Sequence, residues 1–222
     1  MSIRKYLFGL ALLFCTILLG GCPPTDSGGQ ATSAEQARKR IQRQIELNYK
    51  DPDAHYQMGK LHQASGFWSQ AEHELTVALS FDPVHRPSQA AMVKILIDSG
   101  QSAKAKLSAE FYMNQASTSD VGSLNLGVAF QNEGLDDYAL TCYQKALSLA
   151  PSSPKANKQL GYFYLKKGDN EKAKDYLIRS FQADPYQPDV AGELGRLGVA
   201  IQSSPTAKPK PVVAPESGSQ KN

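Results

Sequence analysis

Small and apolar residues recur along the chain with a period of 34, and their spacing inside each period is helical. In the first period, Ala71, Leu75 and Ala78 follow one another at i, i+4 and i+7, which places them on one face of an α-helix. Another helix precedes them and is expected to end at Gly66, because glycine adopts a positive φ at low cost. Pro83 ends the later helix, since proline cannot continue one. Each period therefore predicts two helices joined by a tight turn.

Four phases of the period stand out: a glycine in the turn, an alanine early in the second helix, a small residue in the first helix, and a proline after the pair. They are Gly66, Gly100, Gly134 and Gly168; Ala71, Ala105, Ala139 and Ala173; Gly59, Val93, Gly127, Gly161 and Gly195; and Pro83, Ser117, Pro151 and Pro185. Small side chains at fixed phases are expected where two helices approach too closely for a larger residue. The pattern indicates a helix-turn-helix array, which offers a binding surface rather than a catalytic pocket.

The period divides the chain into four units with a helix at each end. The units are 52–85, 86–119, 120–153 and 154–187. Unit 86–119 is degenerate, since Val93 and Ala109 differ from the residues of its siblings, and its geometry is expected to be slightly altered. Residues 34–51 are in phase with a second helix and residues 188–202 with a first helix. Both segments are predicted to be capping helices.

The third unit carries the pattern most completely. In order, it has Leu126, Gly127, Phe130, Ala139, Tyr143 and Pro151. This order of leucine-glycine, aromatic, alanine and proline resembles the tetratricopeptide repeat family, and the resemblance covers residues 52–187. It implies an all-α fold, a right-handed superhelix (α-solenoid) of stacked helix pairs with capping helices. It also implies that ligands lie in the concave groove lined by the first helix of each pair.

The N-terminal residues have the pattern of a targeting signal. A basic start precedes an apolar run from Tyr6 to Leu19, which is too short to span a bilayer and long enough for a signal-peptide core. Small residues directly before Cys22 resemble the lipobox of bacterial lipoproteins. That resemblance implies removal of residues 1–21 and attachment of palmitate and other acyl chains to Cys22. An ordinary signal peptide with a chance cysteine is the alternative.

Two further segments lack an apolar period. Residues 22–33 are expected to form a flexible tether, and residues 203–222, rich in proline, lysine and serine, a disordered tail. A partner-docking motif within that tail is an alternative to a solvated segment. Residues 51–202 carry 14 basic and 17 acidic side chains. This part of the chain therefore lacks the concentrated basic face of a nucleic-acid binder.

Residues in the groove phases combine an apolar floor with amide and ammonium groups. The candidates are Tyr56, Lys60 and Gln63 in the first unit, Leu124, Asn125, Val128 and Gln131 in the third, and Lys155, Lys158, Tyr162 and Leu165 in the fourth. Such a lining suits an extended peptide or a partner helix. Some family members clamp a C-terminal carboxylate, and this alternative stays open although only Asn125 and Lys155 fall at the phases of that clamp.

The sequence contains no phosphate loop, nucleophile elbow or dinucleotide fingerprint. His55 and His62 lie seven apart on a packing face without a ligand-grade cysteine, so core or rim histidines are expected rather than a metal pair. Cys142 is expected to be a small core residue rather than a reactive thiol. Trp68 is expected to pack between helices, with a binding hot spot as the alternative. We therefore expect no enzymatic activity, no cofactor and no metal.

These features predict a membrane-anchored scaffold or adaptor for protein–protein interaction in the assembly of a bacterial envelope complex. More specific alternatives are a pilotin-like factor for the secretin of a type IV pilus and a docking regulator of cell-wall enzymes. The expected location is the outer membrane, on its periplasmic side, with the inner membrane or the cell surface as alternatives. The expected partners are a protein or peptide in the groove and a membrane through the lipid, without nucleic acid or a small-molecule substrate.

Overall fold

A computed structural model describes residues 33–200, which form ten α-helices and no strand. The predicted signal segment, Cys22, nearly all of the tether and the predicted tail lie outside the described residues. The helices are α1 (Ser33–Leu47), α2 (Pro52–Ala64), α3 (Trp68–Phe81), α4 (Arg86–Asp98), α5 (Ser102–Ala116), α6 (Asp120–Asn132), α7 (Asp136–Leu149), α8 (Pro154–Lys166), α9 (Asn170–Ala183) and α10 (Pro188–Arg196). The prediction of an all-α solenoid of helix pairs is confirmed.

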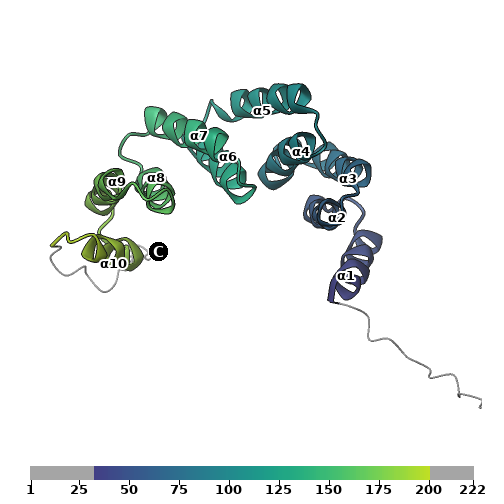
Figure 1. Ribbon diagram of the computed structural model, residues 1–222, viewed down its shortest axis with the longest axis horizontal. Coiled ribbons are helices and arrows are strands. Elements are labelled where there is room, and N and C mark those ends of the chain that lie inside the picture. The colour runs from purple at the N-terminus through teal and green to yellow at the C-terminus, as the bar shows by residue number, and fades with distance from the viewer. Residues whose placement is uncertain (1–32, 201–222) are drawn as a thin grey trace, which may run out of the picture.

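The helix pairs follow one another along an open arch (Figure 1). The first helices of the pairs, α2, α4, α6 and α8, lie on the inner side of this arch, and the second helices lie on its outer side. The single helices α1 and α10 pack against α2 and α9 at the two ends. Among residues 33–200 no helix is both long and apolar enough to cross a membrane.

The turn inside each pair is built around glycine in the left-handed region. Gly66, Gly100, Gly134 and Gly168 have φ values of 73°, 81°, 73° and 77°. A residue with a Cβ would be strained at these angles. The backbone N–H of the residue after the glycine bonds back into the first helix, as from Phe67 to the His62 carbonyl at 2.9 Å. These bonds satisfy carbonyl groups at the end of the helix and fix the second helix beside it.

Three of the four pairs bring their helices together at the predicted small residues. A Cβ built on Gly127 would lie 2.7 Å from ring carbons of Tyr143, and one built on Gly161 would lie 2.6 Å from Leu177. The corresponding distance from Gly59 to Leu75 is 3.1 Å. A real Cβ would overlap or crowd these neighbours, so a glycine on the first helix provides the space for a large side chain on the second.

In the second pair, the larger of the two facing side chains lies on the first helix instead of the second. Val93 occupies the glycine phase on α4, and Ala109 occupies the phase of Leu75, Tyr143 and Leu177 on α5. Both side chains are fully buried. Helices α4 and α5 pack less closely than the helices of the other three pairs. The expected alteration of this unit is therefore visible in its packing.

A buried polar residue recurs with the same period near the start of each first helix, at His55, Gln89, Ser123 and Asn157. Each bonds to a backbone carbonyl just before its helix. The bonds are His55 Nε2 to Tyr49 O at 2.8 Å, Gln89 Nε2 to Pro83 O at 2.7 Å, Ser123 Oγ to Ala116 O at 3.1 Å, and Asn157 Nδ2 to Pro151 O at 3.0 Å. Since an unpaired buried carbonyl is costly, this row of side chains fixes the turns between consecutive units.

The core is continuous from α3 to α8, and a second cluster joins α9 to α10 through Leu177, Val190 and Leu194. Helix α10 ends at Arg196 rather than extending through residue 202 as expected. The chain turns just beyond it at Gly198, which has φ 76°. That glycine at the end of a helix signals a stop, and the sequence analysis did not use it.

Candidate protein-binding groove

A cavity of about 440 Å³ opens on the inner side of the arch between α2, the start of α4 and α6. Its lining includes Tyr56 of α2, Arg86 and Pro87 of α4, and Asn125, Val128 and Ala129 of α6. Apolar carbon from Val128, Ala129 and Pro87 thus lies beside polar groups that include the phenol of Tyr56, the guanidinium of Arg86 and the amide of Asn125. A partly apolar hollow with a few directional polar groups is typical of a site that binds a peptide side chain.

The wall formed by α2 is held in place by the turn before α4. The rings of Tyr56 and His85 meet edge to face, with centroids 5.8 Å apart. His85 in turn contacts Ser88 Oγ through Nδ1 at 2.7 Å and Asp53 Oδ1 through Nε2 at 3.1 Å. The phenol of Tyr56 is therefore positioned by two elements and not only by its own helix.

The far wall is tied to α2 by an ion pair. Lys60 Nζ donates to Glu133 Oε2 at 2.6 Å, joining residues 73 positions apart in the sequence. Only 6% of the Glu133 side chain is exposed, so this carboxylate has little access to water. Burial and the charge of Glu133 raise the pKa of Tyr56, so the phenol keeps its proton at neutral pH. The site thus presents a neutral hydroxyl next to a charge that is already paired.

Arg86 brings a cation to the same cavity. Its Nη1 donates to the amide oxygens of Gln89 at 2.8 Å and Gln115 at 3.3 Å. Burial lowers the pKa of Arg86, and the charge of Asp82 opposes that effect. Two neutral amides hold the guanidinium in place while leaving its charge available to an acidic or carbonyl-bearing ligand.

The predicted residues of α8 have partners in the last helix. Lys158 forms an ion pair with Asp189 of α10, and Tyr162 Oη donates to the same carboxylate at 3.2 Å. Burial, and then the charge of Asp189, raises the pKa of Tyr162 to about 12. Leu165 packs into the cluster of α9 and α10. Helix α10 therefore occupies part of the surface that the sequence assigned to a ligand.

The structure brings three of the eleven predicted groove residues into this cavity, namely Tyr56, Asn125 and Val128. Others have contacts within the protein. Gln63 donates to Asp98 at 3.2 Å, Gln131 accepts from Tyr143 at 2.5 Å, and Leu124 is buried with 7% exposed. Lys155 is exposed.

The sequence analysis missed the residues that the cavity takes from turns and helix ends. They are Asp82, Val84, His85 and Arg86 around the start of α4, and Asn132 and Glu133 at the end of α6. Phases of the first helices could not identify them, because the turn before α4 folds inward between two helices. A charged residue directly after the Asp-Pro turn, as at Arg86, is a signal that could have drawn attention to this position.

Two of the remaining candidates for chemistry, Cys142 and His55, lie in the packed interior. Burial raises the pKa of the Cys142 thiol to about 12, so it stays protonated at neutral pH, and its exposed fraction is 3%. His55 Nδ1 lies 2.7 Å from Glu74 Oε2 and is only 2% exposed. Cys142 is therefore a core residue, as expected, and His55 is part of the contact between α2 and α3.

Helix pairs in series with a hollow on their inner side define an all-α repeat protein. Family models of the tetratricopeptide repeat match residues 123–153 and residues 142–175. These two matches overlap at residues 142–153 in the third unit and extend into the fourth, and the same period continues through the helix pairs before them. The chain is a tetratricopeptide repeat protein. Its fold is that of a protein–protein interaction scaffold.

Several solved structures are similar to the chain in fold. A tetratricopeptide repeat protein of Thermus thermophilus, TTC0263, is 16% identical with a TM-score of 0.45, over 74% of this chain and 90% of that one. MamA of Desulfovibrio magneticus RS-1 is 22% identical with a TM-score of 0.37, over 70% and 88% of the two chains. PilF of Pseudomonas aeruginosa is 23% identical with a TM-score of 0.39, over 72% and 68%. No curated protein matches the chain.

Proposed function

We propose that this protein is a lipid-anchored scaffold of the bacterial cell envelope that holds a segment of a partner protein in the groove between α2, α4 and α6. The observation that carries the proposal is the cavity of about 440 Å³, in which apolar carbon lies beside the neutral phenol of Tyr56 and the guanidinium of Arg86. Such a combination suits a segment with an apolar side chain and an acidic or carbonyl group nearby.

Photo-cross-linking in intact cells tests the groove. A photoreactive amino acid at Val128, inside the cavity, is expected to form an adduct with a specific protein that mass spectrometry identifies. The matched control is Glu110, an exposed residue of α5 on the outer side of the arch. The same adducts at both positions, or none at Val128, would contradict binding in this groove.

The identity of the adduct separates the two more specific roles. A secretin or pilus component would support a pilotin-like role in pilus assembly. A peptidoglycan hydrolase or synthase would support the docking of cell-wall enzymes. Arg86→Ala is expected to weaken binding of either partner by about tenfold or more and to reduce the adduct accordingly, because a charge-assisted hydrogen bond is worth about 1.5–3 kcal/mol.

The membrane anchor has its own test. Cys22→Ala is expected to move the protein from the membrane fraction to the soluble fraction, because no cysteine then remains at the lipobox to carry acyl chains. Mass spectrometry of the purified protein reads the acylation directly. An unmodified Cys22 would refute the anchor and leave the groove proposal standing.

A further inference from the structure

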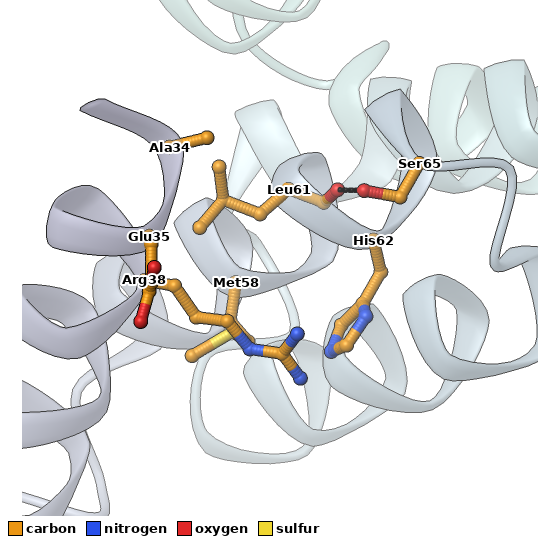
Figure 2. A pocket seen from close by; sticks show the side chains of 7 residues that line it. All are labelled: Ala34, Glu35, Arg38, Met58, Leu61, His62 and Ser65. Carbon is orange, nitrogen blue, oxygen red and sulfur yellow. Dashed lines mark hydrogen bonds between the residues drawn. The ribbon is translucent and has the colours of Figure 1, made fainter. Parts of the chain in front are cut away.

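The end of the arch at which the chain enters α1 carries a second hollow. A cavity of about 190 Å³ lies between the first turns of α1 and the last turns of α2. Figure 2 shows Arg38 reaching across from α1 toward His62, and Met58 and Leu61 of α2 line the same hollow. The first turns of α1 therefore lie against the C-terminal end of α2, next to the turn that leads into α3.

That turn exposes two adjacent aromatic residues. Phe67 is 49% exposed and Trp68 is 36% exposed, and they follow Gly66 directly. The Phe67 ring lies near His62, with centroids 6.3 Å apart. Trp68 is the chain's single tryptophan and the first residue of α3, and most of its surface is covered by the protein. The covered part is compatible with the structural role expected of Trp68, and the exposed part is available to another surface.

Helix α1 is rich in basic side chains, and one of them, Arg38, lines the hollow together with His62, the neighbour of the Phe67 ring. This helix carries Arg38, Lys39, Arg40 and Arg43 against only Glu35 and Glu46, and Ile41 is its one buried residue. Lys39 Nζ lies 3.1 Å from Glu35 Oε1 in an exposed pair, which contributes little to stability. Aromatic rings beside exposed Arg and Lys are typical of protein surfaces at a membrane–water interface.

The length of the preceding chain places this edge near a membrane. Ten residues, from Pro23 to Thr32, separate Cys22 from the first residue of α1. A fully extended segment of this length spans at most about 40 Å. If Cys22 carries acyl chains, the start of α1 cannot lie farther than that from the headgroups. The start of α1 is then the part of the described structure closest in sequence to the anchor, and the turn at Phe67 and Trp68 follows the end of α2 against which the first turns of α1 lie.

We infer that this edge, formed by the first turns of α1 and the turn at Phe67 and Trp68, docks on an anionic phospholipid surface. Phe67 and Trp68 enter the interfacial region, and Arg38 and Lys39 face the lipid phosphates. The inference rests on the proposed lipid anchor, and it adds that the arch is oriented on the membrane rather than free on its tether. Charge complementarity and the reach of the tether both favour a lipid surface over a second protein at this edge.

The single tryptophan provides the test. The full protein, purified from membranes, is reconstituted into vesicles of phosphatidylcholine and phosphatidylglycerol with or without brominated acyl chains. Docking predicts a shift of Trp68 emission to shorter wavelength and a loss of emission in brominated vesicles. Arg38→Glu with Lys39→Glu should remove most of that loss. In the Cys22→Ala protein, Arg38→Glu with Lys39→Glu should reduce the partition coefficient into anionic vesicles by about tenfold or more. Each basic residue near the surface contributes on the order of fivefold to that coefficient.

Controls distinguish docking from general exposure of apolar side chains. Phe67→Ser should reduce the quenching, whereas Leu107→Ser with Phe111→Ser should leave it unchanged, although those α5 side chains are 68% and 63% exposed. Circular dichroism checks that each variant is folded. Unquenched emission from the acylated protein would overturn the inference, and so would quenching that the Phe67 and Arg38–Lys39 variants do not alter. If Cys22 proves unmodified, the proposed lipid anchor is refuted. Binding of the protein to anionic vesicles, followed by Trp68 emission, still decides whether this edge binds lipid.

Discussion

The second and third helix pairs solve the same packing problem with opposite distributions of volume. In the third pair, Gly127 on α6 leaves space that the fully buried Tyr143 ring of α7 fills. In the second pair, Val93 on α4 carries the bulk, and Ala109 on α5 is the small partner. Both arrangements bury the residues completely, yet α4 and α5 pack less closely than α6 and α7. The two pairs therefore differ in which helix carries the larger side chain and in how closely their helices pack.

The second helices of these two pairs also differ on the outer side of the arch. Helix α5 leaves Leu107 and Phe111 largely exposed, and a cavity of about 320 Å³ lies beside its C-terminal end, with Met113 and Cys142 in its lining. Comparable exposure does not occur on α7, where the largest hydrophobic residue that is exposed is Leu149 at its last position. The α7 residues at the phases of Leu107 and Phe111 are Thr141 and Lys145, which are exposed as well, so the two outer surfaces differ in residue type.

The largest expected effect comes from filling the space in the third pair. Gly127→Val should lower the free energy of unfolding by about 3 kcal/mol or more, because its side chain would overlap the buried Tyr143 ring. Denaturant unfolding followed by circular dichroism measures the loss. The matched control is Gly195→Val, at the same phase in α10, where no atom lies within 4 Å of an added Cβ. Similar losses in the two variants would contradict close approach as the reason for Gly127.

In the second pair, the corresponding test enlarges the small residue on the second helix, Ala109. Ala109→Leu should cost about 2 kcal/mol, since Val93 already occupies the space between the helices. Combining it with Val93→Gly rebuilds the arrangement of the sibling pairs, and the combined loss should be smaller than the sum of the two single losses by about 1 kcal/mol. A double-mutant cycle of unfolding free energies measures this coupling, and strictly additive losses would show that positions 93 and 109 do not share one space.

A smaller effect should distinguish the buried polar residues of two units. Gln89 donates to the Pro83 carbonyl and to Gln115 and accepts from Arg86, so Gln89→Ala should cost about 2 kcal/mol. Asn157→Ala should cost about 1 kcal/mol, because the Oδ1 of Asn157 is buried without a hydrogen-bond partner in the described part of the chain, and its loss relieves that penalty. Chemical denaturation of both variants compares them. A larger loss for Asn157→Ala would reverse the proposed ranking of the two turns.

The smallest effect concerns the end of the arch, where a polar contact supplements apolar packing. Burial raises the pKa of Asp189, but the hydrogen bond and charge of Lys158 outweigh it and bring the pKa below its usual value. The ionised carboxylate therefore stabilises the docking of α10 at neutral pH, and this contribution is lost as pH falls through the lowered pKa, below about 4.

Because 49% of the Asp189 side chain is exposed, the contribution should stay below about 1 kcal/mol. Thermal unfolding of the natural protein and of Asp189→Asn, between pH 3 and 7, tests it. The difference between the two proteins should shrink toward the acidic end. A difference that is constant with pH would show that the carboxylate's charge is not responsible.

Much of the fold followed from periodicity. The turns at Gly66, Gly100, Gly134 and Gly168 and the close approach at Gly127 and Gly161 were predictable, because a glycine that recurs at one phase indicates either a positive φ or a neighbour that leaves no room for a Cβ. The buried polar row at His55, Gln89, Ser123 and Asn157 also has this period, but its residues differ in type. No single residue pattern could reveal it, although all four bond to a carbonyl before their helix.

The candidate site was less predictable. Tyr56, Asn125 and Val128 share a cavity as residues on inner helices should, but Arg86 and Glu133 enter it from the first position of α4 and the C-terminal end of α6. Lys158 and Tyr162 were assigned to the ligand surface by their phase, and the structure gives them Asp189 as a partner. A repeat phase specifies which way a side chain points from its own helix. It does not specify what another element places in front of it.

The sequence by itself determined the helix pairs, their order and the small residues between them, because local conformation and close packing depend on residues at fixed separations. Only the tertiary structure decided the course of the turn before α4 and the position of α10, and with them the extent of the groove. The exposure of Phe67 and Trp68 was also decided at that level, since it depends on which neighbours the end of the arch lacks. These properties arise from contacts between distant segments, which no period of 34 residues encodes.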